Sequence, residues 1–364
     1  MIHKISFSNI YSYNHPVEIK FNSTSNIYSI HGHACSGKTN LLHIIEIITH
    51  IFWDVPSYDN LHKIVNRDSN SNIITMAIDF TFDNVCYCFE GEIDLTQNCF
   101  SKQSFKAINS KRYIFKWDNN DDLYSDFFSE AQIATLRTFE YKKNGVFPYV
   151  DSLDDGNRIE ELKALKDAGS KQDYLDLKSL FSTSTSIERI TEMMQIIDPS
   201  LKTISIFDCE LDYQKVQGSP TELSNPKINH SLDLNVSFSY DNYKCTFNQQ
   251  SHGFRKCFKL CIELLASTKQ LYFQPRLIDN LSSYIDDQLL KQILELYGHE
   301  YKRQLIFTSY KSTILESKLL PKESIIIVNK DEICSTIYKL SDYKGLRSSD
   351  RHNWKRMYEQ GKFK

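Results

Sequence analysis

The chain has 364 residues, of which 41% are hydrophobic, and it carries a net charge of −3 at neutral pH. Its 22 Phe and 21 Tyr supply enough large apolar side chains to offset the entropy lost on folding, which excludes disordered and collagen-like proteins. The negative charge does not indicate a nucleic-acid binder, and without a membrane-length apolar run or an apolar signal-peptide core we expect a cytoplasmic protein with no membrane contact.

The first part of the chain has the pattern of strands around one helix. Alternating apolar and polar residues, typical of half-buried strands, occur at residues 2–10, 17–22, 73–95 and 110–116, and residues 26–31 form a further strand candidate. Residues 41–52 are apolar nearly all round, which predicts a helix buried against a sheet. The aspartates between 118 and 126 are expected in a solvated loop, with a metal site as the alternative.

From residue 151 to about 198 the apolar positions take helical spacing, which predicts an insertion of two or three helices. After this segment, helical patterns occur at 254–265 and 286–297. Strand patterns occur at residues 202–207, 232–247, 271–278, 304–308 and 324–329. The last two are continuously apolar, as strands buried in a parallel sheet are. This order of elements predicts an α/β fold.

Glycine is scarce, with 11 residues in the chain, yet two glycines lie within six residues of each other. They frame a match to the phosphate-binding pattern G-x-x-x-x-G-K-[ST], formed by Gly32, His33, Ala34, Cys35, Ser36, Gly37, Lys38 and Thr39. A tight loop between a strand and a helix turns its backbone N–H groups inward, and small side chains let phosphate approach. The pattern therefore predicts nucleotide binding.

Within this segment, Lys38 is expected to reach the β- and γ-phosphates, and the Thr39 hydroxyl is expected to ligate Mg²⁺. Asn40, the next residue, is assigned to the same binding segment. The alternative is a glycine turn in a core strand-to-helix connection, but that interpretation leaves Lys38 and Thr39 unexplained.

A magnesium-bound nucleotide also needs an acidic residue at the end of a neighbouring strand. Asp279 is the best candidate, because an apolar strand pattern precedes it and a helix and the strand at 304–308 follow it. Pro275 fits poorly in a central strand, since proline cannot donate a hydrogen bond to the ladder.

With these motifs in place, the chain resembles the ABC-class ATPases of the RecF, SMC and OLD type. Within that class it is similar to the prokaryotic AAA family ATPases of abortive-infection and anti-phage systems, such as Septu and PARIS components. The likeness lies in the phosphate loop, in a signature-like segment, in a Walker B-like strand with its helix, and in a switch-loop-like strand, at residues 32–39, 250–256, 277–297 and 304–310. It covers about residues 1–150 and 200–364.

The resemblance implies a P-loop NTPase fold of ABC-ATPase type, with a mixed or parallel central sheet, an antiparallel β subdomain and a helical insertion. It divides the chain into an N-terminal ATPase lobe at 1–150, the helical insertion at 151–200 and a C-terminal ATPase lobe at 201–364. It also implies ATP and Mg²⁺ as ligands and a homodimer or higher homo-oligomer. In such an assembly, Ser251 and Gly253 of one subunit contact the γ-phosphate bound by the other.

Two residues depart from the family pattern. Asn280 stands where the family places the catalytic glutamate, and Tyr310 replaces the switch-loop histidine. Losing a general base typically forfeits about 10²–10⁴ in rate, so the resemblance implies ATP binding more strongly than ATP turnover. Tyr11 and Tyr13 are expected to be exposed loop residues, with stacking on the adenine base as the alternative.

The favoured hypothesis is a nucleotide-gated scaffold of an anti-phage defence system, which controls a separate effector such as a nuclease or toxin. The helices of 151–198 then form its oligomerisation or docking arm. The alternative is an active DNA-repair ATPase of RecF or SMC type. That function needs a substitute base, such as Asp286 or Asp287, and DNA contacts from the basic tail at 344–364. A nuclease or toxin in its own right is the third hypothesis, for which we find no catalytic constellation.

Overall fold

The structure is a computed structural model in which two compact units are described separately. The first unit comprises Met1–Ser170, Leu271–Leu281 and Arg303–Lys364, and the second comprises Lys171–Gln270 and Ser282–Lys302. Within these limits the described residues are 1–21, 25–50, 58–66, 69, 71–110, 113–118, 121–124, 184–211, 232–265, 275–283, 285–300, 303–316, 320–331, 334–343 and 351–363.

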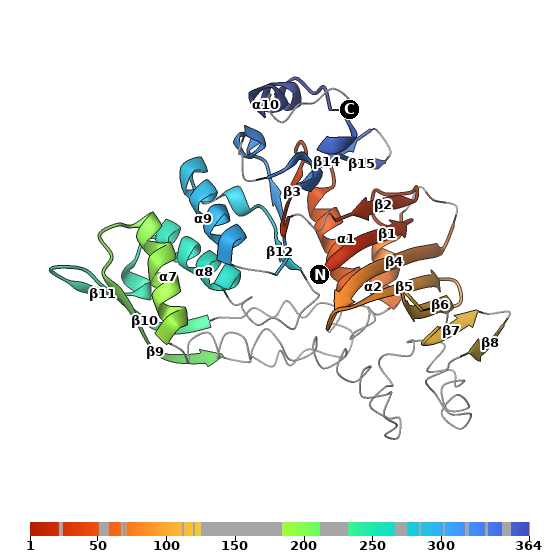
Figure 1. The fold of residues 1–364 in the computed structure, drawn as a ribbon, viewed down its shortest axis with the longest axis horizontal. Coiled ribbons are helices and arrows are strands. Elements are labelled where there is room, and N and C mark those ends of the chain that lie inside the picture. The colour runs from red at the N-terminus through yellow and green to blue at the C-terminus, as the bar shows by residue number, and fades with distance from the viewer. Residues whose placement is uncertain are drawn as a thin grey trace. The chain divides into compact units, whose positions relative to one another are not determined.

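An antiparallel sheet of seven strands forms one layer of the first unit (Figure 1). Period-2 alternation buries one face of these strands, as the sequence predicts. Asp83 and Asn84 connect β4 and β5 with positive φ at both positions, the conformation that a two-residue hairpin turn needs. The strand order is β2 (Val17–Lys20), β1 (Ile2–Ser8), β4 (Ile73–Phe82), β5 (Val85–Asp94), β6 (Cys99–Ala107), β7 (Phe115–Asp118) and β8 (Asp121–Tyr124).

A mixed sheet of five strands forms the second layer of this unit, in the order β12 (Arg276–Ile278), β13 (Leu305–Ser309), β3 (Ile27–His31), β14 (Ile325–Lys330) and β15 (Ser335–Lys339). The first four strands are parallel and β15 is antiparallel. β3 and β13 are buried along their whole length, which explains the apolar run at the start of β13, and the buried residues of β3 include the polar Ser29 and His31. β12 is an edge strand and Pro275 lies just before it, so the proline interrupts no ladder.

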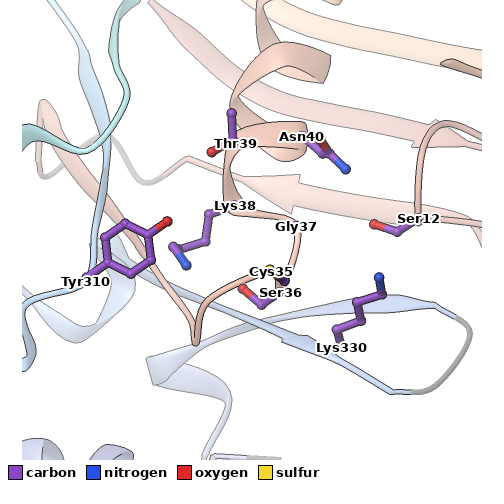
Figure 2. Close-up of a pocket in the computed structure, with 9 residues that line it drawn as sticks. All are labelled: Ser12, Cys35, Ser36, Gly37, Lys38, Thr39, Asn40, Tyr310 and Lys330. Carbon is purple, nitrogen blue, oxygen red and sulfur yellow. The ribbon is translucent and has the colours of Figure 1, made fainter. Parts of the chain in front are cut away.

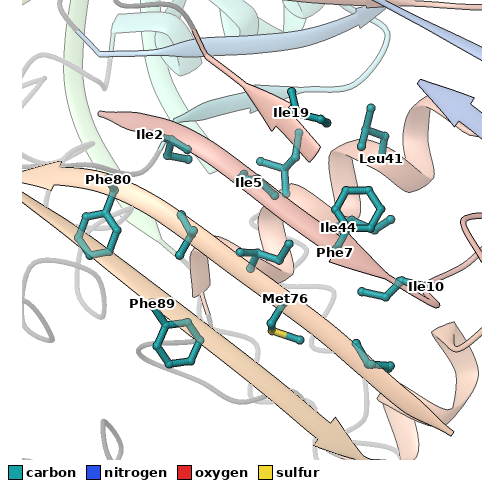
Figure 3. Close-up of a cluster of buried hydrophobic side chains, with 14 of the residues drawn as sticks. Ile2, Ile5, Phe7, Ile10, Ile19, Leu41, Ile44, Met76, Phe80 and Phe89 are labelled. Atoms are coloured by element: carbon teal, nitrogen blue, oxygen red, sulfur yellow. The ribbon is translucent and has the colours of Figure 1, made fainter. Parts of the chain in front are cut away.

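One apolar core joins the two sheets of the first unit (Figure 3). Helix α1 (Lys38–His50) packs against β4 of the antiparallel sheet and β13 of the mixed sheet. The core cluster combines α1, the antiparallel sheet and the mixed sheet through residues such as Leu41, Ile44, Ile5, Met76, Ile306 and Val328. Burial on two sides explains why the sequence of α1 is apolar nearly all round, and it fixes the position of the helix N-terminus.

In the described residues of the first unit, two shorter α-helices occur besides α1. α2 (Tyr58–Ile64) follows α1 along the chain, and α10 (Arg351–Glu359) packs against the short helical turn Ser312–Glu316. Trp354 of α10 is completely buried, so this basic terminal helix is anchored to the unit by its apolar face.

In its described residues, the second unit combines three helices with a small antiparallel sheet. α7 (Ser184–Ile197) packs against α8 (His252–Leu265) and α9 (Asp287–Glu300). The sheet has the order β11 (Lys244–Thr246), β10 (Leu232–Ser239) and β9 (Thr203–Leu211). Phe238 of β10 contacts the Phe254 and Phe258 rings edge-on at centroid distances of 5.0 and 5.1 Å, which fixes the start of α8 on this sheet.

Some sequence predictions need correction. Strand β6 lies at Cys99–Ala107, outside every predicted strand, and the strand predicted at 110–116 begins only at Phe115. Asp118, Asp121 and Asp122 of the aspartate-rich segment lie in the paired strands β7 and β8 instead of a loop, and Asp126 lies outside the described residues. No metal-binding cluster of His, Cys, Asp or Glu occurs among the described residues. The predicted helices within 151–183 lie outside the described residues. No helix in the described ranges is long and apolar enough to cross a membrane.

Candidate functional site

The phosphate-binding pattern forms the loop between β3 and α1 (Figure 2). Gly37 has φ = +105°, a conformation that residues with a Cβ rarely adopt, and a Cβ here would lie 2.7 Å from Ser335 Oγ. A Cβ on Gly32 would collide with the backbone carbonyl of Val328. Both glycines are therefore required by the loop itself, because β14 and β15 pass so close to it.

Lys38 is buried in this loop, with a relative exposure of 3%. Its Nζ donates hydrogen bonds to the carbonyl oxygens of Gly32 and His33, at 2.8 and 2.7 Å. The Tyr310 ring covers the ammonium group at 4.1 Å from its centroid. Burial lowers the pKa of Lys38 to about 8, although the charges of Asp279 and Cys35 act in the opposite direction.

This pKa predicts a pH-dependent affinity for nucleotide. Because the pKa of Lys38 is lowered to about 8, the ammonium is lost as the pH rises through that value, and a neutral amine cannot pair with phosphate. We expect the dissociation constant for ATP to rise by up to about tenfold between pH 8 and pH 9. Isothermal titration at each pH measures it. Lys38→Arg keeps its charge and should show no such rise, and a wild-type affinity that stays constant up to pH 9.5 would overturn the prediction.

Asp279 lies at the end of β12, next to the phosphate loop, as the order of elements predicts. The Thr39 hydroxyl lies 3.2 Å from both carboxylate oxygens of Asp279. Thr308 of the neighbouring strand β13 donates a second hydrogen bond to Asp279, at 2.6 Å, and accepts one from the Asn280 backbone N–H, at 2.7 Å. Thr308 therefore holds both the carboxylate of Asp279 and the backbone that follows it, a role that no pattern in the sequence indicated.

These oxygen donors suit a hard cation. Mg²⁺ binds through one or two protein oxygens, keeps several waters and takes its remaining ligands from phosphates. The Thr39 hydroxyl and the Asp279 carboxylate fit that demand, since both are exposed oxygen groups beside the phosphate loop.

The residue after Asp279 is Asn280, whose side chain is an amide and cannot accept a proton from water. Asn280 has φ = +54°, a region in which asparagine is among the few tolerated residues.

A pocket of about 150 Å³ lies over the loop, lined by Cys35, Ser36, Gly37, Lys38, Thr39 and Asn40 together with Ser12, Tyr310 and Lys330. Figure 2 shows Lys38 and Tyr310 on one side of the loop, and Ser12 and Lys330 on the other. Every loop residue and Tyr310 were expected at the site from the sequence, whereas Ser12 and Lys330 were not. The only sequence signal for Lys330 is that it is the first charged residue after a buried strand.

Serine hydroxyls tie the hairpin of β14 and β15 to the loop. Ser335 Oγ donates to the Ser36 carbonyl oxygen at 2.8 Å and lies 2.6 Å from Ser12 Oγ.

Tyr13 donates from its hydroxyl to the Gly37 carbonyl oxygen at 3.2 Å. Tyr13 is completely buried, so it is neither an exposed loop residue nor available to stack on adenine. Tyr11 instead stacks on His43, at a centroid distance of 6.4 Å.

Helix α10 supports the loop from the C-terminal part of the chain. The Tyr358 ring stacks on His33 with a centroid distance of 5.5 Å and an interplanar angle of 11°. His31, directly before the loop, is fully buried, and this burial, together with the charge of Lys38, lowers its pKa to about 3. His31 is therefore a neutral ring beneath the loop, and Lys38 carries the positive charge there.

The signature-like residues belong to the second unit, which is described by itself. Ser251 Oγ accepts a hydrogen bond from the Phe254 backbone N–H at 3.2 Å, so it caps the N-terminus of α8. Gly253 is exposed, and a Cβ added to it would meet no described atom within 4 Å. Asp286, one of the two substitute bases considered, accepts from the Leu289 N–H and caps α9. Ser251 and Asp286 therefore have local roles, whereas the geometry of this unit gives no reason for a glycine at 253.

No protein-family model and no curated protein matches the chain. Among solved structures, it is similar to the Smc head domain with a coiled coil and joint from Pyrococcus yayanosii, with a TM-score of 0.51, 11% identity, and coverage of 98% of this chain and 99% of that chain. The SMC head domain from Thermotoga maritima gives a TM-score of 0.48 and 13% identity over 93% of this chain and 98% of that chain.

A third similar structure is the Smc head domain from Pyrococcus furiosus with an extended coiled coil, bound to the C-terminal domain of ScpA, with a TM-score of 0.49 and 14% identity over 94% of this chain and 97% of that chain. At such low identities a structural likeness reports the fold and not the activity. The alignment with the Pyrococcus yayanosii head, taken with the strand–loop–helix arrangement of the phosphate loop, shows that the chain has the P-loop α/β fold of ABC-type ATPases.

Proposed function

We propose that the chain is an ATP- and Mg²⁺-binding subunit of ABC-ATPase type that hydrolyses its nucleotide slowly or not at all. The observation that carries this proposal is the 3.2 Å contact between the Thr39 hydroxyl and the Asp279 carboxylate beside the phosphate loop. In a magnesium–nucleotide site of this type, a threonine hydroxyl and a carboxylate placed in this way are the groups by which the protein holds the metal. The adjacent amide of Asn280 supports weak hydrolysis, because it cannot act as a general base.

Bound ATP then acts as a long-lived ligand that controls assembly. In this proposal, two copies of the chain enclose nucleotide between them, and Ser251 and Gly253 of each copy reach the γ-phosphate on the other. The exposure of both residues at the start of α8 supports such a contact. The resemblance to anti-phage ATPases supports the further proposal that the assembly controls a separate effector, such as a nuclease or toxin, in a defence system.

ATP affinity measured beside ATP turnover tests this function. We expect wild-type protein to bind ATP with Mg²⁺ in the micromolar range, and its turnover to stay below about 0.01 s⁻¹, far under the roughly 10 s⁻¹ of a median enzyme. Turnover above about 1 s⁻¹ would exclude the slow-hydrolysis proposal. If duplex DNA raised turnover, and if neutralising Lys355, Arg356 and Lys362 removed that effect, the DNA-repair ATPase would be the better description.

A further inference from the structure

We propose that Lys330 binds the α-phosphate of the nucleotide, on the side of the phosphate loop opposite Lys38. This inference rests on the proposed nucleotide binding and adds to it a second cationic subsite, specific for the part of the ligand that ATP and ADP share. Lys330 lies about 290 residues after the loop in sequence, and it belongs to none of the motifs that predict phosphate binding.

The position of Lys330 relative to the loop is fixed by its strand. Lys330 ends β14 and pairs with Ser335, the first residue of β15, in the antiparallel ladder. Ser335 Oγ in turn donates to the Ser36 carbonyl oxygen of the phosphate loop at 2.8 Å. β14 also runs parallel to β3, with Ile327 opposite His31, so the end of β14 extends alongside the loop. The Lys330 backbone is therefore connected to the loop through its pairing with Ser335 and the hydrogen bond from Ser335 to Ser36.

The direction of the phosphate chain follows from the other groups at the site. Thr39 and Asp279 form the metal side, and Lys38 and Tyr310 lie together on one side of the loop (Figure 2). In loops of this type, the lysine reaches the β- and γ-phosphates, and the backbone N–H groups hold the α- and β-phosphates. The α-phosphate therefore falls on the opposite side, where the Lys330 side chain extends from the end of β14 toward Ser12.

The charge of the pocket agrees with this assignment. Its lining residues include two cations, Lys38 and Lys330, and no carboxylate. In the described part of the chain, no acidic side chain forms an ion pair with Lys330, and the residue is exposed. A lysine ammonium is a mobile point charge with three donors, which suits a phosphate oxygen. The pocket thus holds two positive charges, those of Lys38 and Lys330, and a bound polyphosphate would neutralise both.

Isothermal titration of ATP and ADP into wild type and Lys330→Gln, each with Mg²⁺, tests the inference. ATP and ADP both carry the α- and the β-phosphate, whereas AMP carries the α-phosphate alone. We therefore expect Lys330→Gln to weaken ATP and ADP by the same factor, about fivefold to tenfold, and to weaken AMP, titrated beside them, by a similar factor. An unchanged affinity for AMP would place Lys330 at the β-phosphate and overturn the assignment. Lys330→Arg should restore both affinities, and the loss should shrink at high salt. Lys116→Gln, which removes an exposed lysine of β7 that does not line the pocket, is the matched control and should bind as wild type.

The outcomes separate this inference from the function on which it rests. If wild type binds ATP, and Lys330→Gln binds both ATP and ADP as tightly as wild type does, the subsite is wrong and the nucleotide site stands. If the variant loses ATP alone, Lys330 faces the γ-phosphate and the assignment is overturned. If wild type binds neither nucleotide, both proposals fail. Since Lys330 is exposed, the thermal midpoint of the ligand-free variant should equal that of wild type, which excludes unfolding as the cause of a loss.

Discussion

Lys38→Ala is expected to weaken ATP binding by at least about 100-fold while leaving the protein folded. The variant removes the only positive charge buried in the phosphate loop among the described residues, together with the donor to the Gly32 and His33 carbonyls. Charge-assisted hydrogen bonds to phosphate are each worth about 1.5–3 kcal/mol, and a lysine between two phosphates makes more than one. Isothermal titration with Mg²⁺-ATP measures the loss.

Lys38→Met serves as the matched control for packing, because it keeps an unbranched side chain of similar length without the charge. We expect it to lose ATP as Lys38→Ala does, and to retain more of the thermal stability. Burial of the charge already costs free energy in the unliganded protein, as the lowered pKa of Lys38 indicates. An ATP affinity of Lys38→Met within threefold of wild type would show that the charge at this position does not bind phosphate.

Asn280→Glu is expected to raise ATP turnover by at least about tenfold. The backbone of residue 280 is held by the Thr308 hydroxyl, so a glutamate side chain would leave the chain from a fixed point directly after the metal-side carboxylate of Asp279. A positioned general base contributes about 10²–10⁴ in rate. Part of that gain is offset by strain, because φ = +54° suits asparagine better than glutamate and costs about 1–2 kcal/mol for other residues. Single-turnover hydrolysis measures the change.

Asn280→Gln separates the base from the side-chain length. Glutamine has the same shape and backbone strain as glutamate but cannot accept a proton, so its turnover should equal that of wild type. If Gln raised turnover as much as Glu, the gain would come from geometry and not from a base. If neither variant changed turnover while ATP still bound, Asn280 would not be the cause of slow hydrolysis.

The phosphate loop and its sheet were predictable because their signals are local. The strands β13 and β14 are buried on both faces over most of their length, so each contains a continuous apolar run. Gly32 and Gly37 mark positions where no Cβ fits. The proximity of Asp279 to Thr39 followed from one rule, that the ends of neighbouring parallel strands meet at one edge of a sheet.

Strand β6 was missed for a physical reason. Its buried positions include Ser101 and Gln103, so the apolar alternation that identifies a strand is interrupted by inward-facing polar side chains. Strand β15 was also absent from the predicted strands. It begins with a buried polar residue, Ser335, whose hydroxyl donates a hydrogen bond to the phosphate loop.

The supporting residues of the site could not be predicted, because their contacts join distant parts of the chain. Ser12 and Ser335 are 323 positions apart, and Ser36 and Ser335 are 299 apart. Single serines and lysines carry no periodicity or spacing that points to such partners. Tyr13 shows the converse error, since a tyrosine in a polar segment suggested a loop, yet its ring is packed edge-on against Phe7 at 5.5 Å.

The size of the protein in solution with and without Mg²⁺-ATP tests the central claim most directly. Sedimentation equilibrium of wild type should show a dimer or larger assembly with ATP that dissociates when the nucleotide is removed. Lys38→Ala should stay small because it binds no ATP. Gly253→Ala should bind ATP but stay small, since its added methyl meets nothing within its own unit and interferes only with a second subunit. A wild-type mass that saturating ATP leaves unchanged would contradict the account of a nucleotide-gated scaffold.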